Sequence, residues 1–113
     1  MSAVITAEEL KKKLDAGTGD FVLVDTLKPQ SFEAQHVPGA INVPEEPGFA
    51  EKFEAVAHVP KDREIIVYCS SETCGAHTRA AGALKQAGYT NVVRFSGGLA
   101  GWQAAGLAFQ STN

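Results

Sequence analysis

The feature that most constrains the fold is an unbroken apolar run at residues 65–68, followed at once by Cys69, a short polar loop and an alanine-rich segment. A run of β-branched and aromatic residues favours a strand buried on both faces. Residues 76–87 have a helical composition, so strand, loop and helix form half of a βαβ unit. A helix start presents unpaired N–H groups that stabilise an anion. We therefore expect a lowered thiol pKa at Cys69, whose sulfur is the candidate reacting atom.

The remaining pattern alternates strands and helices. Residues 21–24, 40–43 and 91–94 predict further strands, and Thr6 with Glu9 predicts a capping box for a helix that ends at Gly17. Other helices are predicted at residues 30–35, 49–56 and 99–105, and a frayed tail at residues 110–113. The residues predicted to face the core from the helices are Leu10, Leu14, Phe32, Phe49, Phe53, Val56 and Trp102.

This alternation predicts an α/β fold with a mainly parallel central sheet flanked by helices on both faces. We expect one domain over residues 1–113, with its core at about residues 4–108. Ligands bind such sheets beyond the carboxyl ends of the strands. That rule places Asp25, Cys69 and residues 94–98 on one side of the molecule. Gly97 and Gly98 predict a tight turn with positive φ before the last helix.

Composition excludes several classes of function. The net charge of -3 gives no electrostatic footprint for nucleic acid or an anionic membrane, and no apolar run reaches the length of a membrane span. The amino-terminal residues show no signal-peptide pattern, so we expect a cytoplasmic protein. Two cysteines make neither a disulfide framework nor a zinc site, and no cofactor motif is present. We expect a monomer that needs no metal or cofactor.

Three motifs follow one another along residues 5–107. They are Val24-Asp25 with Pro29, Phe32 and residues 36–42; Val67-Tyr68-Cys69; and Ala87-Gly88-Tyr89 with Val92 and residues 97–102. In this order and spacing they resemble the rhodanese-like (sulfurtransferase) domain family.

The resemblance implies a sulfurtransferase or persulfide carrier. Cys69 would be the catalytic cysteine, which takes a sulfane sulfur from a small donor such as thiosulfate or a persulfide and holds it as a persulfide. A thiol, cyanide or an acceptor protein would then remove that sulfur, so the reaction proceeds in two covalent steps. The loop that would bind the substrate through its backbone N–H groups consists of Ser70, Ser71, Glu72, Thr73, Gly75 and Ala76.

The chain departs from the family pattern in and near this loop. Leu27 and Gly75 stand where members commonly carry arginines, the loop region has about two extra residues by the family's spacing, and Glu72 adds a negative charge. These departures argue against efficient use of free thiosulfate.

Other residues near the loop have two or more interpretations. Cys74 is a resolving thiol for Cys69, a thiol with no role in the reaction, or the better exposed nucleophile. Arg79 is an oxyanion contact, a solvent-facing residue, or a salt-bridging residue with Asp25 or Glu72 as its partner. His77 assists proton transfer, adds a second cation near the loop, or is a surface histidine. Asp25 and His36 are interpreted as structural support, Asp25 for the loop and His36 for the turn that follows it.

Three other functions remain open. A dithiol redox protein would use Cys69 and Cys74. A binding or sensing module would keep the fold without catalysis. A phosphatase or arsenate reductase would need an arginine at the position of Gly75, because the N–H groups of a guanidinium bind a tetrahedral oxyanion in pairs.

Overall fold

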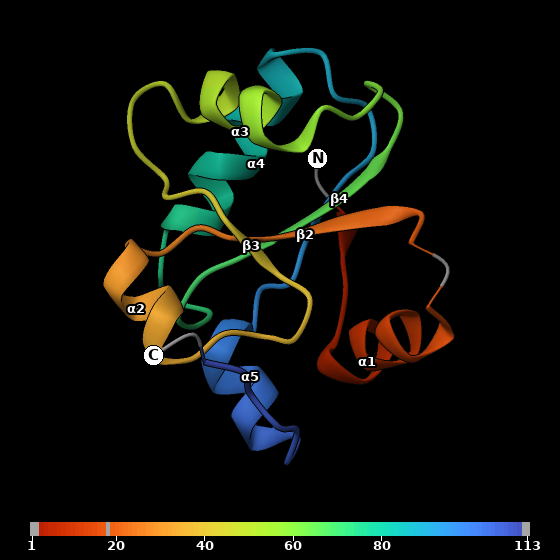
Figure 1. Ribbon diagram of the computed structural model, residues 1–113, viewed down its shortest axis with the longest axis vertical. Coiled ribbons are helices and arrows are strands. Elements are labelled where there is room, and N and C mark those ends of the chain that lie inside the picture. Colours follow the sequence, from red (N-terminus) through yellow and green to blue (C-terminus); the bar gives the residue numbers. More distant parts are fainter. Residues whose placement is uncertain (1–2, 18, 112–113) are drawn as a thin grey trace.

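A computed structural model describes residues 3–17 and 19–111, and its centre is a five-stranded sheet in which every pair of neighbouring strands is parallel (Figure 1). The strands are β1 (Ala3–Val4), β2 (Phe21–Asp25), β3 (Ile41–Asn42), β4 (Glu64–Tyr68) and β5 (Val92–Arg94). Their order in the sheet is β1-β5-β4-β2-β3. Because β4 lies between β2 and β5, it is covered on both edges as well as both faces, which explains its unbroken apolar sequence.

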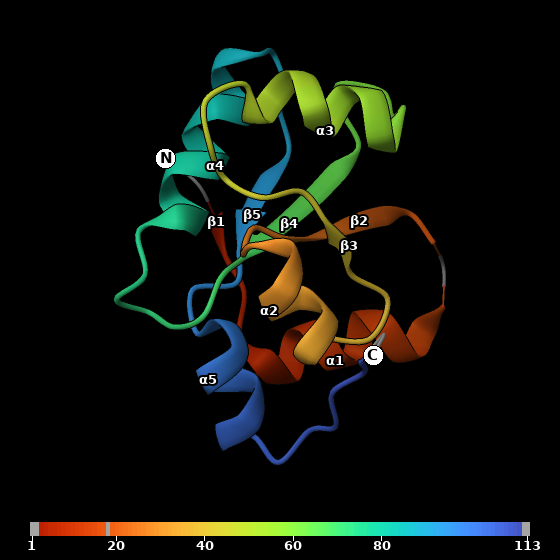
Figure 2. The same ribbon diagram turned by 60° about the vertical axis from the view of Figure 1, so that its left-hand side comes forward.

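Helices cover both faces of this sheet, as the sequence predicts (Figure 2). They are α1 (Ala7–Ala16), α2 (Pro29–Ala34), α3 (Phe49–Ala57), α4 (Ala76–Gln86) and α5 (Gly98–Ala104). One buried cluster joins α3 and α4 to one face of the sheet, and a second joins α1 and α5 to the other. The predicted strands and helices are confirmed with small shifts of their ends, whereas β1 is an edge strand that the sequence analysis missed.

The amino-terminal helix begins and ends as its residues dictate. The Glu9 N–H donates to Thr6 Oγ1 at 3.1 Å, and the Thr6 N–H donates to Glu9 Oε1 at 2.9 Å. At the other end Gly17 has φ +63°, a left-handed conformation that glycine adopts without a Cβ penalty. The predicted capping box and the helix stop are both confirmed.

Two predicted core contacts are wrong. Phe32 lies on α2, a helix with no buried residue, and is half-buried against the His36 ring, with the ring centroids 3.9 Å apart. Val56 on α3 is 57% exposed because the inward stripe of that helix continues through Phe53 to Ala57, four residues on, and leaves Val56 outside it.

The carboxyl-terminal segment is better ordered than predicted. Gln110 pairs with His36 in an antiparallel bridge with two backbone hydrogen bonds of 2.9 Å, so the prediction of fraying is wrong at this residue. Residues 112–113 of the predicted tail lie outside the described part of the chain. Within the described residues no helix has the length and apolar content needed to cross a membrane.

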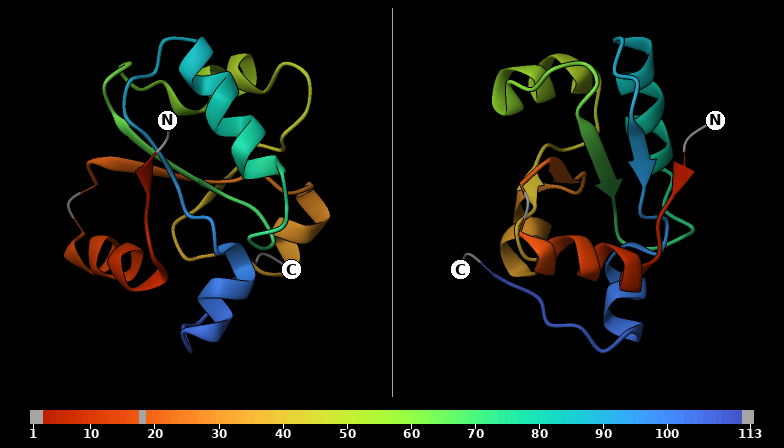
Figure 3. Two further views of the ribbon diagram at one scale, coloured as in Figure 1. Left: turned by 180° about the vertical axis from the view of Figure 1, so that it is seen from behind. Right: turned by 90° about the vertical axis from the view of Figure 1, so that its right-hand side faces the viewer.

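The carboxyl ends of the central strands meet at one edge of the sheet. Asp25 is in register with Tyr68, and Val67 with Arg94. The Phe95 N–H continues this pairing by donating to the Val67 carbonyl at 2.9 Å. The prediction that Asp25, Cys69 and residues 94–98 share one side is confirmed, and Figure 3 shows the loop after β4 next to the start of α5.

Candidate functional site

Cys69 follows the last residue of β4 and has no exposed surface. The start of α5 fixes its main chain, because the Leu99 N–H donates to the Cys69 carbonyl at 3.1 Å and the Ala100 N–H donates to that of Ser70 at 2.9 Å. Gly98 permits this approach, with φ +59° and a position at which an added Cβ would lie 2.3 Å from the Cys69 carbonyl oxygen. The predicted positive φ is therefore found at Gly98.

The loop after Cys69 turns back on itself. The Cys74 N–H donates to the Ser71 carbonyl at 3.1 Å, and the hydroxyls of Ser71 and Thr73 lie 3.1 Å apart. Of the other predicted loop residues, Ser70, Glu72 and Gly75 are exposed, whereas Ala76 is buried at the start of α4.

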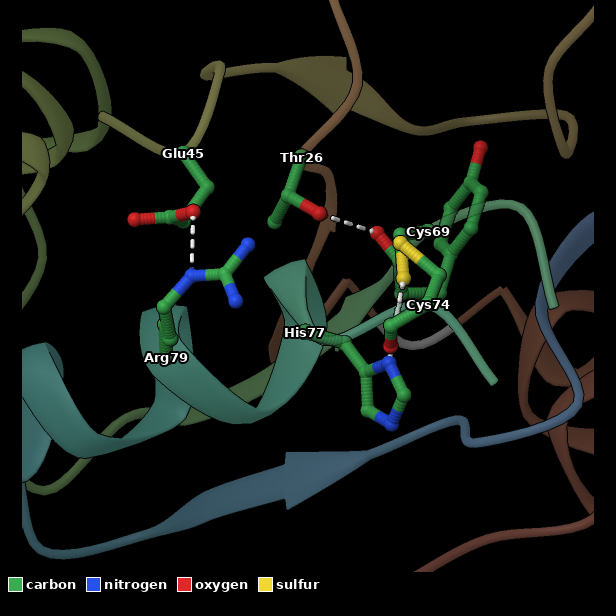
Figure 4. A network of polar contacts seen from close by, with 7 residues as sticks. Thr26, Glu45, Cys69, Cys74, His77 and Arg79 are labelled. Atoms are coloured by element: carbon green, nitrogen blue, oxygen red, sulfur yellow. Dashed lines mark hydrogen bonds and ion pairs between the residues drawn. The ribbon is translucent and has the colours of Figure 1, made fainter. Parts of the chain in front are cut away.

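This turn brings the second cysteine to the first. The Cys69 sulfur lies 3.4 Å from the carbonyl oxygen of Cys74 and 3.9 Å from that of Ser71, and each thiol is close enough to the other to shift its pKa. Figure 4 shows both sulfur atoms together near the first turn of α4. Cys69 is buried and Cys74 half-buried, and both are free thiols.

His77 reaches the same sulfur from α4. Its Nδ1 atom lies 3.0 Å from Cys69 Sγ, and the residue is only 2% exposed (Figure 4). The interpretation of His77 as a surface residue is therefore wrong, because the first turn of α4 presents this position to the sheet. Burial, and then the positive charge of Arg94, lower the pKa of His77. A neutral imidazole at neutral pH follows, so the interpretation of His77 as a second cation near the loop is wrong.

The two thiols have opposite pKa shifts. Burial, reinforced by the hydrogen bond to Cys74, raises the pKa of Cys69 to about 11, so the expected lowering at this residue is wrong in this conformation. Burial also opposes ionisation of Cys74, but hydrogen bonds from the Cys69 thiol and from the Ala76 and Ser70 N–H groups outweigh it and lower the pKa of Cys74. N–H groups at the start of α4 therefore act on both sulfur atoms, Ala76 on Cys74 and His77 on Cys69, but only the pKa of Cys74 is lowered overall.

Arg79 makes an ion pair with a residue from another part of the chain. Its Nε donates to Glu45 Oε1 at 2.8 Å, so the predicted partners, Asp25 and Glu72, are wrong (Figure 4). Glu45 is anchored beside α4 because its N–H donates to the Thr26 carbonyl at 2.9 Å. Nothing in the local pattern identifies Glu45, which lies 34 residues before Arg79 in the sequence.

The guanidinium also lies close to the loop. An added Cβ on Gly75 would lie 2.7 Å from Arg79 Nη1. The absence of a side chain at Gly75 therefore leaves the space that the Arg79 guanidinium occupies.

The hydrogen bonds of Asp25 and His36 go to groups other than the two sulfur atoms. The Asp25 carboxylate is fully buried and accepts hydrogen bonds from the Tyr68 hydroxyl at 2.8 Å and the Leu27 N–H at 2.9 Å. Tyr68 in turn accepts from the Val37 N–H at 3.0 Å, which ties the segment after α2 to β4. His36 Nδ1 is 2.7 Å from the Phe32 carbonyl oxygen at the end of α2. Asp25 therefore holds the end of β4 next to the loop through Tyr68, whereas His36 holds the end of α2, so its predicted hydrogen bond to the turn that follows it is wrong.

A shallow pocket of about 340 Å³ opens beside the loop, between Ser71, Glu72 and Thr73 on one side and Gly97, Ala100 and Gly101 on the other. A larger pocket of about 470 Å³ lies at the start of α3 and the end of α4 and includes no residue of the loop. Among the described residues no group of three or more His, Cys, Asp or Glu side chains is placed to hold a metal ion. The loop pocket lies beside the turn that carries the two cysteines, but neither cysteine is among its lining residues.

The family model for the rhodanese-like domain matches residues 6–105. The chain therefore belongs to the rhodanese-like domain family. A protein named sulfurtransferase from Allochromatium vinosum is 34% identical over 104 residues, which cover 91% of this chain and 90% of that protein.

Two longer relatives come from Mycobacterium tuberculosis. The HTH-type transcriptional regulator Rv0324 is 35% identical over 91% of this chain and 42% of its own length. The probable adenylyltransferase/sulfurtransferase MoeZ is 31% identical over 88% of this chain and 24% of its own length. The chain thus spans less than half of these two relatives.

Solved structures agree with this assignment. The rhodanese-like domain of the Anabaena protein Alr3790 has a TM-score of 0.83 and 27% identity, covering 98% of this chain and 80% of that one. The BH2092 protein from Bacillus halodurans, at 24% identity, shares the fold with a TM-score of 0.84 over 98% of this chain and 78% of that one.

Proposed function

We propose that this protein is a sulfurtransferase that carries a sulfane sulfur as a persulfide on Cys69. The observation that carries the proposal is the 3.0 Å contact between Cys69 Sγ and His77 Nδ1 at the carboxyl end of the central parallel strand. A buried thiol with a raised pKa reacts poorly unless a base takes its proton as the bond forms. A neutral imidazole at hydrogen-bond distance supplies that base.

In the first step, His77 Nδ1 takes the proton of the Cys69 thiol while the sulfur attacks the outer sulfur of a donor, R–S–SH. The new S–S bond forms at Cys69, and the bond between the donor's two sulfur atoms breaks. The donor leaves as a thiolate, R–S⁻, which takes the proton from His77. The products are the Cys69 persulfide and a thiol, and His77 is again neutral.

The charges around the loop support an organic persulfide as the donor over the thiosulfate dianion. Glu72 is exposed at the rim of the loop pocket, where it repels a dianion. The nearby cation, Arg79, is already paired with Glu45. A donor without a dianionic end is repelled less by Glu72 and does not need an unpaired cation.

The proposal is tested by incubating Cys74→Ser with a low-molecular-weight alkyl persulfide under anaerobic conditions and measuring the intact mass. We expect the gain of one sulfur atom, removed by added thiol, and no gain in the double variant with Cys69→Ser. Cys74→Ser is the background because it leaves a single thiol. The single variant Cys69→Ser gives the matched measurement for the other cysteine.

Two outcomes would overturn the proposal. Uptake that persists in Cys69→Ser and is lost in Cys74→Ser would assign the persulfide to Cys74. No uptake in the wild type or in either single variant would favour a binding or sensing module that keeps the fold without catalysis.

A further inference from the structure

The two thiols of the chain occupy the two ends of one short turn, which places the Cys69 sulfur 3.4 Å from the Cys74 carbonyl oxygen. The turn is closed by the hydrogen bond from the Cys74 N–H to the Ser71 carbonyl. Cys74 is therefore the nearest other thiol to any group carried on Cys69.

Exposure separates the two sulfur atoms. Cys69 has no exposed surface, whereas Cys74 is half-buried. A persulfide formed on Cys69 therefore meets Cys74 directly, and an external acceptor must reach a fully buried residue. The structure favours an internal first acceptor.

We propose that Cys74 resolves the Cys69 persulfide and releases hydrosulfide, so that the protein converts persulfides to hydrosulfide through an internal disulfide. The Cys74 thiolate attacks the inner sulfur of Cys69–S–SH. The bond between Cys69 Sγ and Cys74 Sγ forms, the bond to the outer sulfur breaks, and the outer sulfur leaves as HS⁻ with the bonding electron pair. This activity rests on the proposed persulfide on Cys69.

The cycle closes with an external dithiol. The Cys69–Cys74 disulfide takes two electrons from that dithiol, which is oxidised to its own disulfide, and both cysteines return to thiols. Over one turnover a persulfide donor and a dithiol are consumed, and a thiol, hydrosulfide and the oxidised dithiol are formed.

The leaving groups favour attack at the inner sulfur. Attack at the outer sulfur would expel the Cys69 thiolate, which burial makes a strong base, whereas attack at the inner sulfur expels hydrosulfide, a weaker base. The attacking group is favoured as well, because the N–H groups of Ala76 and Ser70 stabilise the Cys74 thiolate. The turn that brings the Cys74 carbonyl oxygen to 3.4 Å from Cys69 Sγ also holds Cys74 beside the inner sulfur.

The test treats wild type and Cys74→Ser with one equivalent of alkyl persulfide, without oxygen or other thiols. In the wild type we expect about one hydrosulfide per chain, a mass lower by two hydrogen atoms and no alkylatable cysteine, with both thiols restored by dithiothreitol. In Cys74→Ser we expect the persulfide to persist, with hydrosulfide reduced about tenfold or more until an external thiol is added. Cys74→Ala should behave like Cys74→Ser.

The outcomes separate the two proposals. A wild type that retains one added sulfur with no disulfide, while Cys74→Ser also gains sulfur on Cys69, would overturn the resolving role of Cys74 alone. A sulfur found on Cys74 in the wild type would do the same, because it requires attack at the outer sulfur. Failure of Cys74→Ser to gain sulfur would overturn the persulfide on Cys69, and the resolving role with it.

Discussion

Replacing Gly98 by alanine places a methyl group against the main chain that holds the candidate nucleophile. The added Cβ would lie 2.3 Å from the Cys69 carbonyl oxygen and 3.0 Å from the carbonyl carbons of Cys69 and Ser70. All three are backbone atoms, so no side-chain rotation relieves the overlap. The oxygen would have to move by roughly 0.7 Å to reach 3.0 Å, close to the limit that steric repulsion sets. Such a shift strains the hydrogen bond from the Leu99 N–H to that oxygen.

Two effects add to the destabilisation. A non-glycine residue in the left-handed region costs about 1–2 kcal/mol, and Gly98 has φ +59°. Forcing a methyl group into a filled site costs about 1–3 kcal/mol more. We therefore expect Gly98→Ala to lower the free energy of unfolding by about 2–5 kcal/mol, a large part of the stability of a domain this size.

Gly17→Ala is the matched control. Gly17 has φ +63°, nearly the same as Gly98, but an added Cβ there meets nothing within 4 Å. This substitution should lower the free energy of unfolding by only about 1–2 kcal/mol, from the backbone conformation alone. Urea unfolding of the three proteins gives the difference, and mass-resolved alkylation shows whether Gly98→Ala exposes Cys69. Equal losses in the two variants would refute the claim that contact with the Cys69 carbonyl requires a glycine at position 98.

Three further predictions concern the supporting structure. Tyr68→Phe removes the hydroxyl that bonds the buried Asp25 carboxylate and the Val37 N–H, so urea unfolding should show a loss of about 1–3 kcal/mol. Burial raises the pKa of Asp25 above 3.8, so the stability that its protonation contributes is complete below about pH 4 and is lost as the pH rises through the raised pKa. The non-titrating Asp25→Asn should therefore cost more free energy of unfolding at about pH 4 than at about pH 7, and a cost that grows with pH would contradict this sign. On α3, Phe53→Ala should cost about 3–5 kcal/mol, whereas Val56→Ala should change stability by less than about 0.5 kcal/mol, and similar urea midpoints would contradict the orientation of the helix.

The architecture was predictable because the signals that set it are local. Unbroken apolar runs mark the buried parallel strands, and Thr6, Glu9 and Gly17 mark the ends of a helix through contacts within a few residues. Val56 was predicted wrongly because the sequence of a short helix fits an inward face at either of two neighbouring positions. Only packing against α4 and the sheet decides which of the two positions is buried.

The site was less predictable because its contacts join distant parts of the chain. Cys69 and the loop after it stand out in the sequence, but the burial of His77 depends on how α4 docks on the sheet. The pairing of Arg79 with Glu45 depends on where the segment after β3 passes. The pKa order of the two thiols depends on the path of the loop, which the composition of the loop does not specify.

The loop path itself makes a last prediction, because the two sulfur atoms compete for the same donors. The Ser70 N–H bonds both thiols, and the hydrogen bond and negative charge of Cys74 are among the causes that raise the pKa of Cys69. Cys74→Ser removes that charge and leaves a hydroxyl that does not ionise near neutral pH. The pKa of Cys69 should therefore fall, and its alkylation at neutral pH should become faster than in the wild type. Mass-resolved alkylation from about pH 6 to 11 measures this for each cysteine separately. An unchanged or higher pKa of Cys69 in the variant would mean that burial alone sets its acidity and that the second thiol does not control the first.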